Sequence, residues 1–122
     1  MNNNCLFCKI IDGQIPSTKV YEDESVLAFK DINPAAPIHI LVIPKKHYVD
    51  FTEMDDDIIL KVNKVANNMK NLIYDKLNAD GIKLVNNYGI EQVVKHYHLH
   101  IIPIYKEDEI LTIEEVYDKL KK

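Results

Sequence analysis

The sequence has no excess of positive charge, few cysteines and no long hydrophobic stretch. Its 122 residues include 15 lysines and arginines against 19 aspartates and glutamates, for a formal net charge of −4. This balance argues against nonspecific nucleic-acid binding as the main activity, because no basic patch is visible. No apolar segment approaches the ~20 residues of a transmembrane helix, and the N-terminal segment Met1–Cys5 is unlike a signal peptide. We therefore expect a cytoplasmic protein with no membrane partner, in which two cysteines do not form a structural disulfide.

The chain also lacks internal repeats, low-complexity tracts and segments typical of linkers. A length of 122 residues is enough to bury a core, although dimerisation would add to its stability. A composition of 47% hydrophobic and 28% charged residues is ordinary for a globular protein. Residues 1–122 are therefore predicted to form a single domain.

Three of the five histidines occupy alternate positions in the segment Lys95–Tyr105, which reads KHYHLHIIPIY. Its other residues are mainly β-formers, and Pro103 ends the run, so the segment predicts a strand. Alternate side chains of a strand point to one face, which places His96, His98 and His100 on one surface. Three interpretations are open at this point. The face is simply solvated, or it contributes to a metal site with another element, or one histidine is a catalytic nucleophile or base.

The remaining pattern predicts an α+β fold. Asp55–Leu77 has apolar residues at helical spacing and acidic residues in its first turn, which is typical of a helix packed on a sheet. A shorter helix is expected to begin at Cys5 and end at Asp12–Gly13, and Glu107–Lys122 is predicted to form an amphipathic C-terminal helix. Together with the histidine-rich strand, four segments predict an antiparallel sheet of about five strands: Thr18–Tyr21, Ser25–Ile32, Ile38–Ile43 and Ile82–Val85.

The two cysteines form a C-x-x-C motif, Cys5-Leu6-Phe7-Cys8. Such a motif alone has three interpretations. It can be a redox pair, although no thioredoxin-like βαβ pattern follows it. It can also be two buried cysteines, or half of a Cys₂His₂ zinc site that takes two histidines from elsewhere in the chain.

Several blocks of the sequence resemble one known family. His96–Ile102 has the pattern His-φ-His-φ-His-φ-φ, with φ hydrophobic, which resembles the signature of the histidine triad (HIT) family of nucleotide hydrolases and transferases. Cys5–Ser17, Val26–His47 and Val85–Asn87 resemble the family's other blocks, in the same order. The resemblance covers nearly the whole chain. It implies the HIT-like fold, an antiparallel sheet of about five strands with one long helix packed on it and a C-terminal helix.

The resemblance also implies a structural zinc site. In the zinc-bearing branches of the family, two such cysteines join two histidines, which by position are His47 and His96 here. The implied ligands are therefore Cys5, Cys8, His47 and His96, and four protein ligands leave no open coordination position. The phosphoramidase branch typified by Hint lacks these cysteines, so the pair favours the bacterial zinc-bearing relatives.

A nucleotide site is implied as well. Asp31, at a strand end, can accept both hydroxyls of a ribose, although a carboxylate there is also an ordinary turn residue. By resemblance it binds the ribose, and His39 corresponds to a fourth active-site histidine, although it could equally be a satisfied core residue. Asn86 and Gln92 occupy positions of family motifs at this site. The resemblance forms the base slot from four residues that could instead be simple core packing: Phe7, Ile10, Phe29 and Ile32.

The implied reaction is attack on the α-phosphorus of a nucleotide by a ring nitrogen of His98. A neutral imidazole is a capable nucleophile near neutral pH, and the product is a nucleotidyl-histidine that water hydrolyses. His100 would hydrogen-bond a non-bridging phosphate oxygen and stabilise the charge of the transition state. His96, the third member of the catalytic triad, would hold the strand through zinc.

Two residues depart from the family pattern. Val93 replaces a serine or threonine whose hydroxyl assists the leaving group, and Glu91 replaces a glycine that binds phosphate.

The residues that distinguish the branches of the family point in two directions. Asn86 is typical of the phosphoramidase branch, whereas Val94–His96 resembles the dinucleoside polyphosphate branch. We expect a homodimeric hydrolase or nucleotidyl transferase that acts on purine nucleoside phosphoramidates or on related derivatives of AMP. The alternatives are a dinucleoside polyphosphate hydrolase, a nucleotide-binding module with little turnover, and a zinc-dependent structural protein.

Overall fold

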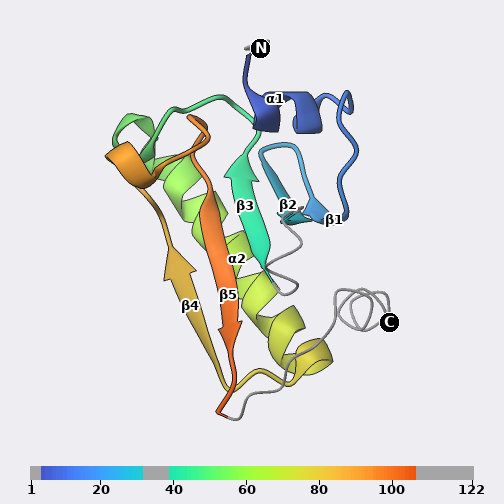
Figure 1. The fold of residues 1–122 in the computed structure, drawn as a ribbon. Helices are drawn as coiled ribbons and strands as arrows, with labels where there is room; N and C mark the ends of the chain where they lie inside the picture. Colours follow the sequence, from blue (N-terminus) through green and yellow to red (C-terminus); the bar gives the residue numbers. More distant parts are fainter. Residues whose placement is uncertain (1–3, 32–38, 107–122) are drawn as a thin grey trace.

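The computed structural model describes residues 4–31 and 39–106. Within these ranges the chain forms a five-stranded antiparallel sheet with the strand order β1-β2-β3-β5-β4 (Figure 1). The strands are β1 Lys19–Glu22, β2 Val26–Lys30, β3 Ile40–Pro44, β4 Gly81–Val85 and β5 Leu99–Ile104. The helices are α1 Leu6–Ile11 and α2 Asp56–Leu77, with 3-10 turns η1 Phe51–Glu53 and η2 Gly89–Glu91. The predicted α+β class, the five strands and the long helix are confirmed.

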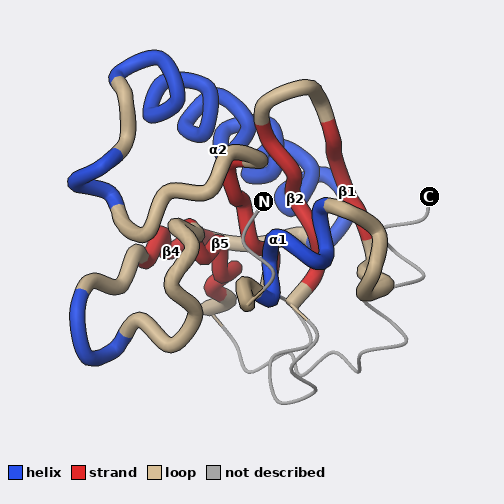
Figure 2. The backbone as a smooth tube through the Cα atoms, turned by 90° about the horizontal axis from the view of Figure 1, so that it is seen from above, coloured by secondary structure: helices blue, strands red, loops and turns tan. Residues whose placement is uncertain are grey.

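Helix α2 matches the predicted periodicity. Asp56 and Asp57 lie in its first turn, where negative charge offsets the helix dipole, and Asn78 ends it in the left-handed conformation with φ of 52°. One side of the helix is buried against the sheet through Val62, Val65, Ala66, Met69, Ile73 and Leu77. The helix therefore covers one face of the sheet, as Figure 2 shows from above.

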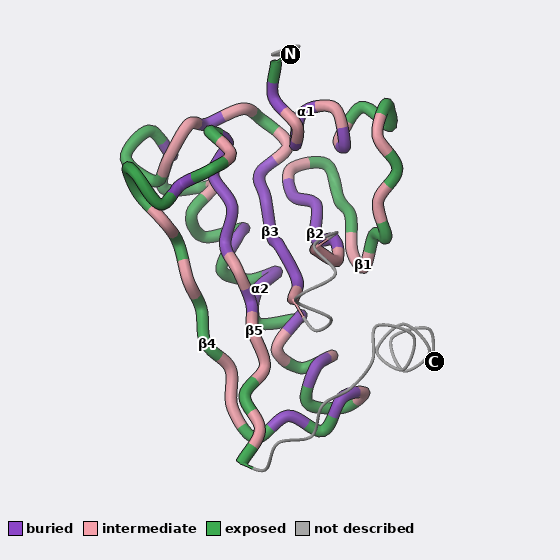
Figure 3. Tube along the Cα trace, in the orientation of Figure 1, coloured by how far each residue is buried: buried purple, intermediate pink, exposed green. Residues whose placement is uncertain are grey.

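The sheet has two distinct faces because its strands alternate. Val26, Ala28, Val42 and other residues of one parity pack with α2. Residues of the opposite parity pack with α1 in a second cluster, which contains Cys5, Cys8, Phe7, Ile10, Leu27, Phe29, Leu41 and Ile43. Burial is continuous along β3, whereas the residues of the edge strand β4 are exposed or partly exposed (Figure 3). The short helix α1 thus covers the face opposite α2.

The same alternation places the predicted site on the α1 face. Leu41 pairs with His100 in the register of β3 and β5, so both side chains lie on this face. His39 precedes Leu41 by two positions, and Asp31 follows Phe29 by two. Residues from three strands therefore converge on the side of the sheet that α2 leaves free.

The histidine-rich strand is shorter than predicted. It begins at Leu99, so His100 lies within β5 while His96 and His98 precede it. The cause is a detour of the chain toward the loop after β3, where the Tyr97 amide donates to the Tyr48 carbonyl at 2.7 Å. The expectation that all three histidines share one regular strand face is therefore corrected.

Several other predictions can be placed. Helix α1 ends at Ile11 with Asp12 as its C-cap, followed by Gly13 with φ of 82°, as expected. Ile32 and the predicted helix Glu107–Lys122 lie outside the described residues. Across 4–31 and 39–106, no helix combines the length and the apolar character needed to cross a membrane.

Candidate functional site

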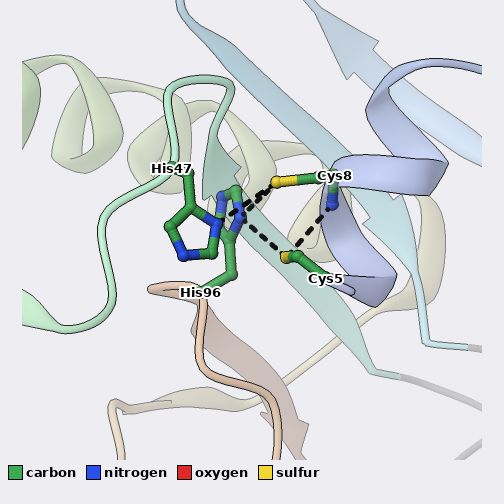
Figure 4. A group of neighbouring side chains, drawn as sticks. All are labelled: Cys5, Cys8, His47 and His96. Atoms are coloured by element: carbon green, nitrogen blue, oxygen red, sulfur yellow. Dashed lines mark hydrogen bonds between the residues drawn. The ribbon is translucent and has the colours of Figure 1, made fainter. Parts of the chain in front are cut away.

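Cys5, Cys8, His47 and His96 form a compact cluster between α1, the loop after β3 and the approach to β5. Their ligand atoms all lie within 4.8 Å of one another. The Cys8 sulfur is 3.2 Å from His47 Nδ1 and 3.5 Å from His96 Nδ1, and the Cys5 sulfur is 3.4 Å from His96 Nδ1. Figure 4 shows the four side chains pointing toward a common centre. In a tetrahedral zinc site, sulfur and nitrogen ligands are separated by about 3.5 Å, so the predicted ligand set fits this metal.

The groups around the cluster also suit a metal. The ring of His96 is fully buried, and its Nε2 is 2.8 Å from the Pro44 carbonyl, to which it donates. Nδ1 is then the unprotonated nitrogen that faces the sulfurs, as second-shell hydrogen bonds of metal-bound histidines arrange. Burial lowers the pKa of His96 to about 4, which keeps the ring neutral. The Cys8 amide donates to the Cys5 sulfur at 3.3 Å, which fixes that sulfur at the N-cap of α1.

A cavity of about 290 Å³ lies on the same face, between α1, the sheet and the β4–β5 loop. This volume is on the order of that of a small-molecule site. Six of the residues predicted to bind a nucleotide line it: Phe7, Ile10, Phe29, Asp31, His98 and His100. The side of the cavity formed by α1 and β2 is apolar and includes an edge-to-face contact of Phe7 with Phe29, whose ring centroids are 5.6 Å apart. An apolar slot and a group of polar side chains thus share one cavity.

His98 is held in one orientation at the floor of this cavity. Its Nδ1 donates to the His96 carbonyl at 2.7 Å, so Nε2 carries the lone pair. Asn86 donates from its side-chain amide to the His98 carbonyl at 3.1 Å, which fixes the backbone as well. Burial lowers the pKa of His98, although the bond to the His96 carbonyl and the negative charge of Asp31 oppose it. A neutral ring with an unprotonated Nε2 is the form that attacks phosphorus.

His100 belongs to a chain of polar groups that also contains His39 and Asp31. His39 Nδ1 is 3.4 Å from the Asp31 carboxylate, and His39 Nε2 is 2.6 Å from His100 Nδ1. Burial, and then the neighbouring His98 and His39, lower the pKa of His100 to about 4, against the opposing charge of Asp31. The Nε2 atom of His100 is buried and has no hydrogen-bond partner among the described residues. A buried polar atom without a partner is a candidate contact for a ligand.

Three predicted nucleotide-site residues do not line the cavity: His39, Asn86 and Gln92. His39 and Asn86 contact His100 and His98, so they lie one layer behind the cavity. Gln92 is 3% exposed, and its amide donates to two backbone carbonyls, from the loop after β3 and from its own loop. These three residues support the cavity.

The cavity lining also contains residues that were not predicted as site residues: Leu6, Leu41, Asn87, Glu91, Val93 and Val94. Leu41 could have been predicted, because it lies two positions after His39 and its side chain therefore points to the same face of the sheet. Glu91 and Val93 were visible in the sequence only as departures from a family motif. Asn87 and Val94 belong to the β4–β5 loop, whose inward position gives no periodic signal in the sequence. Leu6 lies in α1, which is too short for its periodicity to show which side faces the cavity.

Comparison with known proteins identifies the family. The HIT domain model matches residues 12–107. This chain belongs to the HIT family. An uncharacterized HIT-like protein of Methanocaldococcus jannaschii is 50% identical over 119 residues, which cover 92% of this chain and 88% of that protein.

Two other HIT-related proteins are informative. An adenylylsulfatase of Arabidopsis thaliana is 36% identical over 118 residues, covering 95% of this HIT protein and 60% of the plant protein. The crystal structure of a zinc-bound histidine triad family protein from Mycobacterium smegmatis superimposes with a TM-score of 0.82 at 31% identity, covering 97% of this chain and 94% of that one. The fold is therefore that of the HIT family, and one relative of this fold is a zinc-bound protein.

Proposed function

We propose that this HIT protein hydrolyses purine nucleoside phosphoramidates, or related derivatives of AMP, at the α-phosphorus. The observation that carries the proposal is the state of His98, which lines the cavity with Nδ1 bound to a carbonyl and Nε2 unprotonated. The acidic Asp31 and the buried Nε2 of His100 lie at the same cavity. The adenylylsulfatase among its relatives supports chemistry at an adenylyl group.

The proposed reaction has two displacements. His98 Nε2 attacks the α-phosphorus, the bond from phosphorus to the leaving nitrogen breaks, and that nitrogen takes up a proton from water. Water then attacks the nucleotidyl-histidine, the bond from phosphorus to Nε2 breaks, and AMP leaves with the new oxygen. The net reaction consumes one water and yields AMP and an amine. Asp31 binds the ribose hydroxyls, Phe7 and Phe29 contact the base, and His100 binds a phosphate oxygen.

The cysteine and histidine cluster is proposed to hold zinc in a structural role. Zinc held by Cys5, Cys8, His47 and His96 would supply a cross-link between α1 and the approach to β5, without an open position for substrate. Phe7 is next to Cys8 in the sequence and lines the cavity. The cluster therefore fixes one side of the nucleotide site.

A second copy of the chain is the proposed partner, at the edge formed by β4. This strand is last in the sheet order, and on the described residues its outer edge has no neighbouring strand. Leu84 is 52% exposed there, and Tyr74 on α2 is 39% exposed. A shallow groove between α2 and β4 includes Leu84 and Ile82. An edge strand beside exposed apolar side chains favours a homodimer.

A nucleotide-binding module with little turnover is the second candidate. Val93 lines the cavity, is 89% exposed and has no hydroxyl for the leaving group. Removal of one such transition-state contact lowers a rate by about 10²–10³-fold. The two candidates share a nucleotide site and differ in turnover.

One experiment separates them. The protein is incubated with an adenosine 5′-phosphoramidate, and AMP release is followed by chromatography, with His98→Ala as the control. AMP binding to both proteins is measured by thermal shift. Turnover that is lost in His98→Ala while AMP binding remains supports the enzyme. Equal, slow hydrolysis by both proteins supports the binding module instead.

A further inference from the structure

Apart from its two histidines, the described lining of the nucleotide cavity has acidic side chains and no lysine. Among the described residues, its charged lining consists of Asp31 and Glu91, and no lysine contributes. The whole sequence has no arginine, so the planar guanidinium that binds phosphate with two hydrogen bonds is absent. A polyphosphate leaving group brings several negative charges, and no lysine among the described lining residues pairs with them. The charge of the site therefore disfavours this class of leaving group.

Glu91 is fixed in the cavity wall by the loop that carries it. It is the last residue of η2, which begins at Gly89 with φ of 83°, a conformation that favours glycine. Lys95 Nζ donates to the Gly89 carbonyl at 3.1 Å, and the backbone amide of Gln92 donates to the same carbonyl at 3.0 Å. The buried side chain of Gln92 anchors the next position. The loop therefore holds Glu91 in the lining of the cavity.

The lining of the cavity comes from different parts of the chain. Helix α1 and strand β2 contribute the proposed base slot. The β4–β5 loop contributes Glu91 and Val93. With the nucleoside in the base slot and phosphorus at His98, we expect the leaving group beside Glu91 and Val93.

We propose that Glu91 selects amine leaving groups that carry a second, positively charged end. The aliphatic part of the amine lies on Val93, and its terminal ammonium pairs with the Glu91 carboxylate. This inference rests on the proposed function, because it concerns the leaving group of the same reaction. The chemistry is that given above, in which the bond from phosphorus to nitrogen breaks and the free amine takes a proton from water.

The test compares adenosine 5′-phosphoramidates whose amines have the same length and end in an ammonium, a methyl group or a carboxylate. kcat/KM is measured for each with the wild type, Glu91→Gln and Glu91→Lys, at low and high salt. Asp75→Asn is the matched control, because it removes one exposed negative charge from α2, on the other side of the sheet. Diadenosine tetraphosphate is assayed with and without Mg²⁺, since a divalent ion can neutralise its phosphates.

The wild type and Asp75→Asn should prefer the ammonium tail over the methyl tail by roughly two- to fivefold, as partly exposed ion pairs do, and high salt should reduce the preference. Glu91→Gln should remove this preference, and Glu91→Lys should shift it to the carboxylate tail. Equal kcat/KM for all three tails overturns the inference and leaves the proposed function standing. A preference for diadenosine tetraphosphate, with or without Mg²⁺, also overturns the inference. If no phosphoramidate is hydrolysed, the proposed function itself fails.

Discussion

At the scale of single residues, the chemistry depends on the protonation of His98. Its pKa is lowered chiefly by burial, so its neutral form persists below the ordinary value of about 6.5. kcat/KM should therefore stay constant from about pH 8 down to about 6.5 and fall only at lower pH. The measurement is a pH–rate profile with the zinc content checked at each point. A profile with its acid limb centred at or above about pH 6.5 contradicts this account.

The row of interacting side chains Asp31, His39 and His100 predicts that the protein takes up a proton when it binds a ligand. The Asp31 carboxylate lies 3.4 Å from His39 Nδ1, and its negative charge favours a proton on that nitrogen. His39 Nε2 then accepts from His100 Nδ1, which leaves His100 Nε2 unprotonated. A phosphate oxygen can only accept a hydrogen bond, so His100 Nε2 must be protonated to bind it. Binding of adenosine 5′-methyl phosphate, which does not itself titrate near neutral pH, should thus take up about one proton.

Calorimetry in buffers of different ionisation enthalpy measures this uptake. His39→Asn should bind the same ligand with less proton uptake, because it interrupts the connection to Asp31. Zero uptake by the wild type, or an equal uptake by both proteins, contradicts the arrangement. His39 acts here as a positioning residue, since it contacts His100 and does not line the cavity.

At the scale of elements, the proposed zinc site should stabilise α1. The helix has only six residues, Leu6–Ile11, too few to be stable alone. Cys8→Ser should therefore lower the zinc content, reduce the melting temperature by roughly 5–10 °C and weaken AMP binding. Elemental analysis, thermal unfolding and titration with AMP check the three effects. Lys9→Ser, on the same helix and not one of the four ligands, serves as the control. A wild type without bound zinc, or an unchanged Cys8→Ser protein, contradicts the proposed role.

The elements themselves could largely be predicted from the sequence. Helix α2 was visible because its apolar face repeats over 22 residues, and the strands were visible from alternation and turn residues. The placement of His98 and His100 on one face followed from the same alternation. The start of β5 was wrong because the bond between Tyr97 and Tyr48 joins residues far apart in the sequence.

The candidate site likewise contains residues that the sequence could predict and residues that it could not. Residues that resemble family motifs, such as Phe7, Asp31 and His98, could be named in advance, and the structure places them at one cavity. The supporting roles of Gln92 and Asn86 could not be predicted from the sequence. They depend on hydrogen bonds from these side chains to backbone carbonyls. Local patterns do not encode such contacts.

At the scale of the whole molecule, the exposed apolar edge predicts the oligomeric state. Leu84→Lys should convert a dimer to a monomer, because it places a charge among apolar side chains of the β4 edge. Leu60→Lys is the control, since Leu60 is 57% exposed on α2, next to Lys61, which reaches Ser25 at the β1–β2 turn. Light scattering after size exclusion gives the mass of each protein. A monomeric wild type, or a dimeric Leu84→Lys protein, contradicts the proposed interface.

The central claim is that His98 itself bonds to phosphorus. The most direct measurement is rapid quenching of the wild type with an adenosine 5′-phosphoramidate, followed by mass spectrometry of the peptide that contains Lys95–Tyr105. The account predicts an adenylyl group on His98 during turnover, which disappears as AMP forms and is never seen in His98→Ala. AMP formation with no adduct at any time point, or an adduct on a different residue, contradicts it.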